Sequence, residues 1–95
     1  MVNKAHVPPF VLRLEEVFNF SSGVTVLVGT LESGAPSVLA PCDVELVIGD
    51  QSRGKIRLEA ERMLGPGSKE RRAVETKAEV RADEVREQRC VLIHR

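Results

Sequence analysis

Residues 10–34 constrain the fold most strongly, because they contain two apolar runs joined by turn-forming residues. In the first run Phe10, Leu12 and Leu14 alternate with other residues, which is the period-two pattern of a half-buried strand. The second run is rich in valine and alternates in the same way. Residues 21–23, between the runs, are Ser-Ser-Gly, and glycine reaches positive φ without a Cβ clash. The stretch therefore predicts a β-hairpin.

Shorter strand patterns follow the hairpin. Residues 42–48 and 55–63 each alternate apolar with polar residues, as strands with one solvated face do. A glycine-flanked loop is predicted between them at 49–54, and residues 89–94 predict a closing strand. Several short strands separated by turn signals indicate a small all-β sandwich or barrel.

Residues 69–88 fit two patterns. Their alanine, glutamate and arginine content favours helix. The residues that recur near helical spacing are Val74, Ala78, Ala82 and Val85. The same stretch also alternates as a strand. Because closure of a barrel needs another strand in this part of the chain, we predict strand for 73–82.

The chain is long enough for one domain with one core, at 95 residues. Pro8 and Pro9 hold the backbone extended before the first strand. We therefore predict a flexible N-terminal arm over 1–9 and a single β-barrel domain over 10–95.

Charge is balanced over the whole chain but not along it. The formal net charge is zero, so no global attraction to nucleic acid or membrane is expected. Residues 1–50 hold two basic and six acidic side chains, whereas residues 51–95 hold twelve and eight. The second half can therefore present a basic face, although a plain solvated surface explains the same residues. With three Phe and no Trp or Tyr, the chain lacks the usual aromatic platform for single-stranded bases.

Several classes of protein are excluded by what the sequence lacks. No apolar run approaches the ~20 residues that span a bilayer, and the N-terminal residues do not form a signal peptide. Cys42 and Cys90 are far apart in the sequence, and we therefore expect them to be reduced thiols of a cytosolic protein. No phosphate-binding G-x-x-x-x-G-K-[ST] loop is present. We expect a cytoplasmic protein that neither contacts a membrane nor binds GTP directly.

The sequence also predicts no enzyme, no cofactor and no metal. Glu15 and Glu16 are adjacent, so on a regular strand they point to opposite faces and cannot share a proton. Cys90 and His94 would be about 13 Å apart at ~3.3 Å per strand residue, too far for activation of the thiol. The cysteines and histidines have no paired-ligand spacing.

Residues 15–34 resemble the opening of the second-domain β-barrel of translational GTPases such as elongation factor Tu. That family runs E-D-V-F, an apolar residue, a short G-R-G turn and then T-V-x-x-G-R-[IV]-E-x-G. The matching positions are Glu15, Val17, Phe18, Thr25, Val26, Gly29, Glu32 and Gly34. The arginine and second glycine of G-R-G are Gly23 and Val24 here, and the later G-R arginine is Thr30.

Two later stretches continue the resemblance. Residues 40–49 resemble the family's V-G-D-E-V-E-[IL]-V-G, with Pro41 in place of the first glycine. Residues 58–62 resemble its V-E-M-H-R, with Glu61 at the histidine. The resemblance implies a small closed six-stranded antiparallel β-barrel of Greek-key type, covering the chain from Phe10 onward and free-standing, without the GTPase domain.

In that family the barrel holds the aminoacyl-adenosine end of tRNA between the E-D-V-F and E-x-H-R strands. The resemblance therefore implies an adenosine-like pocket with apolar walls for a base, carboxylates for ribose hydroxyls and an arginine for phosphate. Its candidate residues are Glu15, Glu16, Phe18, Phe20, Val26, Glu59 and Arg62. A simpler interpretation needs no ligand. The apolar residues of this set would then be part of the core, and Glu59 and Arg62 would form a solvated ion pair.

Two functions follow. The first is a non-catalytic RNA- or ribosome-associated module, with tRNA, ribosomal RNA or a translation-related protein as its partner. Candidate phosphate contacts are the basic residues around two loops: Arg53, Lys55, Arg57, Lys69, Arg71 and Arg72. The second is a protein-interaction or scaffold barrel that has no role with nucleic acid. One barrel fold hosts many functions, so the resemblance alone does not choose between them.

Overall fold

The computed structural model describes residues 7–34, 38–62 and 70–95. Within these ranges the chain forms six strands and one short helix. In chain order the elements are β1 (Phe10–Asn19), β2 (Thr25–Ser33), β3 (Cys42–Ile48), β4 (Gln51–Arg62), β5 (Arg71–Thr76), α1 (Ala82–Glu87) and β6 (Cys90–His94).

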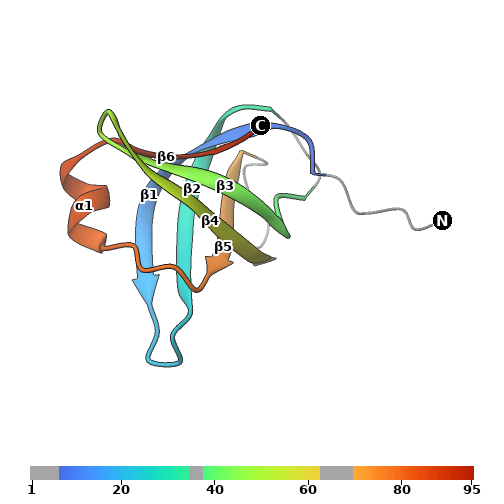
Figure 1. The fold of residues 1–95 in the computed structure, drawn as a ribbon. Helices are drawn as coiled ribbons and strands as arrows, with labels where there is room; N and C mark the ends of the chain where they lie inside the picture. The colour runs from blue at the N-terminus through green and yellow to red at the C-terminus, as the bar shows by residue number, and fades with distance from the viewer. Residues whose placement is uncertain (1–6, 35–37, 63–69) are drawn as a thin grey trace.

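The strands form one closed sheet. Each strand pairs antiparallel with two neighbours, in the order β1-β2-β5-β4-β3-β6 and back to β1. The prediction of a mostly β fold with a closed six-stranded antiparallel sheet is therefore confirmed. The ring is not an even barrel, because β4 has 12 residues and β6 has five. The end of the β1–β2 hairpin extends beyond the ring (Figure 1).

The predicted hairpin is present. β1 and β2 pair along nearly their whole length, from Val11 opposite Ser33 to Asn19 opposite Thr25. In the turn, the Gly23 amide donates to the Phe20 carbonyl oxygen at 3.0 Å. Gly23 has φ +92°, which a residue with a Cβ rarely adopts. The Ser-Ser-Gly sequence therefore supplies the turn as its composition indicates.

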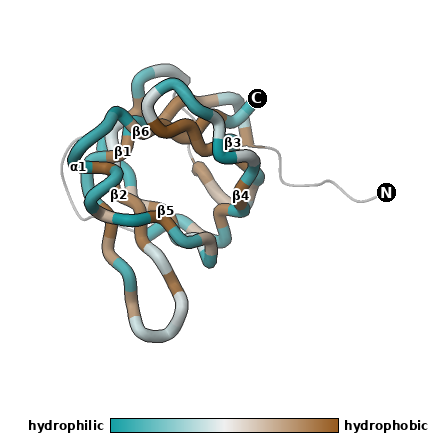
Figure 2. The backbone as a smooth tube through the Cα atoms, turned by 60° about the vertical axis from the view of Figure 1, so that its left-hand side comes forward, coloured by the Kyte–Doolittle hydropathy of each residue, from teal (hydrophilic) through white to brown (hydrophobic). Residues whose placement is uncertain are grey.

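One core fills the inside of the ring, and the alternation of β1 supplies part of it. Phe10, Leu12 and Leu14 are each at most 4% exposed. The other large, fully buried side chains are Leu27, Leu39, Leu58, Leu92, Val44, Val74, Val80, Thr76 and Cys90. Apolar and polar stretches alternate along the strands, with apolar colour prominent on β6 (Figure 2). Both cysteines are free and buried, as predicted.

A second, smaller apolar cluster lies on the outside of the sheet. Val26 and Val28 of β2 contact Ala73 of β5, and all three are at most 5% exposed. Leu27 and Val74, one residue along, face the inside of the ring. β2 is therefore buried on both faces, whereas alternation alone predicts one solvated face.

Residues 49–62 differ from their prediction in two ways. The predicted loop at 49–54 is mostly strand, since β4 already begins at Gln51. A register shift between Leu58 and Ala60 then exchanges the two faces of β4. Glu61 pairs with Val74 and joins the inner side, which is the reverse of the predicted alternation.

The strand predicted over 73–82 is wrong in its second half. β5 ends at Thr76, whose hydroxyl donates to the Arg57 carbonyl oxygen at 2.7 Å and accepts from the Ala78 amide at 3.1 Å. These bonds turn the chain away from the sheet. The helical pattern then prevails in α1, which buries Val85. The two readings of 69–88 each describe a different part of the segment.

α1 covers an edge that the ring leaves open. β6 pairs with β1 only along Phe10–Arg13, because β6 is short. α1 packs beside the rest of β1 (Figure 1), and its Val85 belongs to the core cluster. An unpaired strand edge is a template for aggregation, and a helix placed over it is one way of protecting it.

Part of the predicted N-terminal arm packs against the ring. Val7 is 4% exposed and belongs to the core cluster. Its carbonyl oxygen lies 2.7 Å from Nε2 of His94, and Nδ1 of the same ring lies 3.0 Å from the carbonyl oxygen of Asp43. His94 of β6 therefore joins the N-terminal arm and β3 to its own strand.

Candidate functional site

The structure brings most of the predicted pocket residues to the outer side of the hairpin. We call the outward side chains Glu16, Phe18, Phe20, Val26 and Arg62 the hairpin face. Phe18 pairs with Val26 across β1 and β2, and Val26 pairs with Glu75 of β5. Arg62 of β4 reaches the same place, since its Nε donates to the Glu75 carboxylate at 2.6 Å.

Two of the three phenylalanines of the chain are exposed on this face. Phe18 is 46% and Phe20 47% exposed, while Phe10 is in the core. The Arg62 guanidinium carbon lies 5.4 Å from the centre of the Phe20 ring, within the range of a cation–π contact. Glu75 and Phe20 together hold the Arg62 side chain in place. The hairpin face is thus a half-exposed aromatic surface beside a fixed guanidinium.

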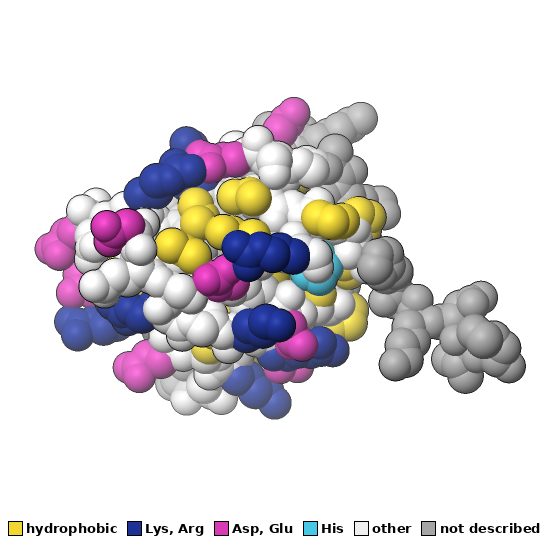
Figure 3. All heavy atoms as spheres, turned by 45° about the horizontal axis from the view of Figure 1, so that its top comes forward, with side chains coloured by type: hydrophobic (Ala, Val, Ile, Leu, Met, Phe, Trp, Pro, Cys, Tyr) yellow, Lys and Arg dark blue, Asp and Glu magenta, His cyan; other side chains and the backbone are white. Residues whose placement is uncertain are grey.

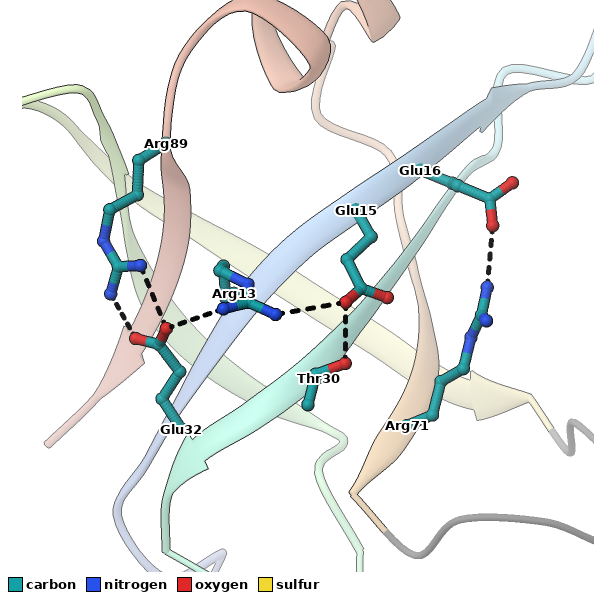
Figure 4. A network of polar contacts seen from close by, with 7 residues as sticks. All are labelled: Arg13, Glu15, Glu16, Thr30, Glu32, Arg71 and Arg89. Atoms are coloured by element: carbon teal, nitrogen blue, oxygen red, sulfur yellow. Dashed lines mark hydrogen bonds and ion pairs between the residues drawn. The ribbon is translucent and has the colours of Figure 1, made fainter.

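Glu15 and Glu16 lie on the same face of β1, which corrects the expectation that they point to opposite faces. The register with β2 shifts between Leu14 and Glu16, so Glu15 is an extra, bulged residue. Glu15 accepts a hydrogen bond from Thr30 Oγ1 at 2.8 Å, and Glu16 accepts one from Arg71 at 2.7 Å (Figure 4).

Each of these carboxylates has its own partners. The hydrogen bond from Thr30, opposed by desolvation and helped by Arg13, lowers the pKa of Glu15 below its ordinary value. Glu15 is therefore ionised at neutral pH and is an acceptor only. Arg71 supports Glu16 with an ion pair in which both side chains are about half exposed.

Glu59, the remaining member of the predicted pocket, is not joined to the hairpin face. It is the extra residue of the β4 bulge and is exposed. It makes no hydrogen bond or ion pair with any part of the chain that the structure describes.

The predicted phosphate contacts are dispersed, and the four arginines among them are paired with carboxylates. Lys55 of β4 forms no hydrogen bond or ion pair with a described residue. Ion pairs join Arg53 to Glu84 at 2.8 Å, Arg57 to Asp43 at 3.3 Å, Arg71 to Glu16 at 2.7 Å and Arg72 to Glu61 at 2.9 Å. Arg72 is only 16% exposed. Lys69 lies outside the described residues. On the face seen in Figure 3, acidic and basic side chains alternate and do not gather by sign.

A groove that the sequence did not indicate crosses the outside of β3, β4 and β6. It has a volume of about 720 Å³, and His94, Arg95 and Lys55 are among its lining residues. Cys42 also borders it, but burial raises the pKa of that thiol to about 11. The Cys42 thiol is therefore protonated at neutral pH and is a poor nucleophile.

A smaller pocket of about 300 Å³ lies between β1 and α1. Its lining residues are Glu15, Glu16, Val17, Phe18, Ala82 and Arg86. Three of them belong to the pocket set implied by the resemblance. Ala82 and Arg86 were missed, because the sequence reading placed strand where α1 begins. The helical spacing of 74–85 was the one signal that could have found them.

Among residues 7–34, 38–62 and 70–95, no group of three His, Cys, Asp or Glu side chains could hold a metal ion. No helix in the described part of the chain has the length and apolar character to cross a bilayer. No protein-family model, curated protein or solved structure matches this sequence.

Proposed function

We propose that this protein is a non-catalytic RNA- or ribosome-associated binding module that contacts RNA with its hairpin face. The observation that carries the proposal is the exposure of Phe18 and Phe20 beside Arg62. Nearly half-exposed phenylalanines are costly to leave in water, whereas nucleobases stack on them at ~1–3 kcal/mol per base.

The guanidinium of Arg62 adds a second flat surface. It already lies over the Phe20 ring, and its planar group can stack on a base or bind a phosphate with two hydrogen bonds. The chain has few aromatic residues, but two of its three phenylalanines are exposed on the hairpin face, where they can stack on bases.

The arrangement of strands supports the resemblance to the translation-factor barrel. β3, β4 and β5 are consecutive neighbours and β6 returns to lie beside β3, which is the spatial order of a Greek key. The segments that resemble E-D-V-F and E-x-H-R are β1 and β4, and both contribute to the hairpin face. We propose that the family's mode of holding an RNA end is retained here.

The test is fluorescence anisotropy of a labelled tRNA and a labelled ribosomal RNA fragment, at about 50 and 200 mM salt. We expect dissociation constants on the order of micromolar that rise about fivefold or more in Phe20→Ala and in Arg62→Gln. Because most arginines are paired with carboxylates of the chain, binding should weaken less with salt than for a protein with free cations.

Val38→Ala is the matched control, since Val38 is another large apolar side chain that is 49% exposed, in the connector between β2 and β3. It should leave RNA affinity unchanged. Absence of binding at the lower salt, or equal losses in all three variants, would overturn the proposal.

A second candidate is a protein-interaction or scaffold barrel. The observation that favours it is the pairing of nine of the ten arginines with carboxylates among the described residues, which leaves little net positive charge for RNA. An exposed aromatic patch with neutral surroundings is also typical of a protein contact. Capture of a protein that requires Phe20, combined with absence of RNA binding, would support this candidate.

A further inference from the structure

The groove on the outside of β3, β4 and β6 is separate from the hairpin face. Its volume of about 720 Å³ lies within the ~300–1,000 Å³ of small-ligand pockets. The three strands and the N-terminal arm supply its lining residues. The hairpin face and the pocket between β1 and α1 contribute none of them. A ligand in this groove would therefore leave both of those surfaces free.

One wall of the groove is held in place by the imidazole of His94. The two ring nitrogens lie 2.7 Å from the Val7 carbonyl oxygen and 3.0 Å from the Asp43 carbonyl oxygen. The centre of the same ring lies 5.5 Å from the centre of the Phe10 ring. Val7 and Phe10 are at most 4% exposed, so these contacts connect the wall to the core. A ligand would meet a surface that needs little further ordering, which favours binding.

Lys55 is the one cation of the groove that has no carboxylate partner among the described residues. Arg57 is paired with Asp43 at 3.3 Å. Arg95 is paired with Glu45. Lys55 is exposed and lies opposite Glu45 across β3 and β4, yet it makes no hydrogen bond or ion pair with a described residue. Its ammonium group is therefore available for the acidic group of a ligand.

The charge of the groove selects the kind of anion. Three cations and two carboxylates line it, so its formal net charge is +1 with histidine counted as neutral. One negative charge matches this balance, whereas a phosphate dianion would exceed it and would approach Asp43 and Glu45. Hydrogen bonds from Ser52 and Arg95 lower the pKa of Glu45, so that carboxylate stays ionised. Arg57 can add a second contact, because its ion pair with Asp43 is more than half exposed on both sides and is weak.

An apolar side chain lies on the other side of β3 from Lys55. Ile93 of β6 and Lys55 of β4 are both opposite Glu45, the first across β3 and β6 and the second across β3 and β4. Two strand spacings of ~4.8 Å separate them, which is about 10 Å. Ile93 is partly exposed, and Pro41 adds an exposed apolar ring to the lining. A ligand that uses both sides needs an acidic group at one end and an apolar body long enough to reach Ile93.

We infer that this groove binds a small monocarboxylate with an apolar body, with the carboxylate on Lys55 and Arg57 and the body against Ile93 and Pro41. The inference goes beyond the proposed RNA function and does not rest on it, because no residue of the hairpin face takes part. It assigns Lys55, which the sequence indicates as a phosphate contact, to a carboxylate instead.

The test is titration of ¹⁵N-labelled protein with octanoate, followed by NMR chemical shifts. We expect a dissociation constant on the order of millimolar, as is usual for a ligand of so few atoms. The shifts should be confined to residues 41–45, 55–57 and 93–95 and their immediate neighbours. Lys55→Gln should raise the dissociation constant about fivefold or more, because a charge-assisted hydrogen bond is lost. Acetate should bind about fivefold or more weakly than octanoate, because it cannot reach Ile93 from Lys55.

Lys77→Gln is the matched control, since Lys55 and Lys77 are the two lysines that the structure describes. Lys77 is also exposed and forms no ion pair with a described residue, yet it does not line the groove. Both substitutions remove one positive charge, so a difference between them does not arise from net charge. Lys77→Gln should leave octanoate affinity within about twofold. Far-UV circular dichroism of both variants checks that the fold is retained.

The outcomes separate this inference from the RNA function. Octanoate binding that requires Lys55 but not Lys77 would support the groove, with or without RNA binding. Equal losses in the two lysine variants, or shifts centred on the hairpin face, would overturn the inference. Tighter binding of inorganic phosphate than of octanoate would overturn the choice of a monocarboxylate. RNA binding that requires Phe20, with no shifts on addition of octanoate, would overturn the inference and leave the RNA function standing.

Discussion

Gly29 shows how one residue sets the path of two strands. A Cβ built on Gly29 would overlap the carbonyl oxygen of Arg13 and would lie 3.1 Å from Leu14 Cα, so β1 and β2 approach closely just where β1 bulges. We expect Gly29→Ala to destabilise the fold by about 1–3 kcal/mol, because backbone atoms must move. Urea unfolding measures the effect.

Gly23→Ala is the comparison for Gly29. Its Cβ would meet nothing within 4 Å, and only the positive φ opposes it, at ~1–2 kcal/mol. Gly29→Ala should therefore be the more destabilising of the two. A Gly29→Ala protein as stable as the wild type would show that the close approach of the two strands is not a constraint.

At the scale of elements, an ion-pair network joins β1, β2 and the start of β6. Glu32 accepts hydrogen bonds from Arg89 and Arg13 (Figure 4), and the Arg89 hydrogen bond is the main cause that lowers the pKa of Glu32 below its ordinary value. A carboxyl whose folded pKa is depressed stabilises the fold above its unfolded pKa, and the contribution is lost as pH falls through the folded value.

We therefore expect the urea concentration at the unfolding midpoint to decrease as the pH is lowered from about 5 to about 3. The decrease should be smaller in Glu32→Gln. Glu59→Gln is the control, because Glu59 is exposed and makes no ion pair with the described residues, so its pH profile should follow the wild type. The network would have no part in acid stability if Glu32→Gln and the wild type lost stability in parallel.

The elements were predictable from sequence to different degrees. Period-two alternation located β1, β2 and β3, because each keeps one inward face over most of its length. It failed where a bulge exchanges the faces, at Glu15 and Glu59, since a bulge depends on strand pairing distant in the chain. It also missed where β5 ends, which the contact of Thr76 with the Arg57 carbonyl determines.

At the scale of the molecule, the candidate site could be predicted only in part. The resemblance of residues 15–34 indicated Glu15, Glu16 and Phe18, which line one pocket, and Phe20, which is exposed beside Arg62. It could not indicate Arg86, because α1 and β1 are distant in the sequence and are brought together only by the tertiary structure. Nor could composition show that the basic residues are paired, since their carboxylates come from other strands.

The reactivity of the two cysteines can be used to measure whether the closed sheet opens as a unit. Cys42 begins β3 and Cys90 begins β6, and both are in the core cluster. Burial raises the pKa of both thiols, that of Cys42 to about 11, so few thiolates form at about pH 8. Cys42 is 6% and Cys90 0% exposed. We expect a thiol-reactive disulfide reagent to label the native protein only through unfolding.

In the single-cysteine variants Cys42→Ala and Cys90→Ala, the remaining thiol should then react at one common rate, which rises with urea in parallel with the loss of structure. The reason is topological: in a closed ring, neither β3 nor β6 can separate from its neighbours without breaking two ladders. Fast labelling of Cys90 alone without urea would show instead that the five-residue β6 and α1 open locally, and the pocket between β1 and α1 would then open with them.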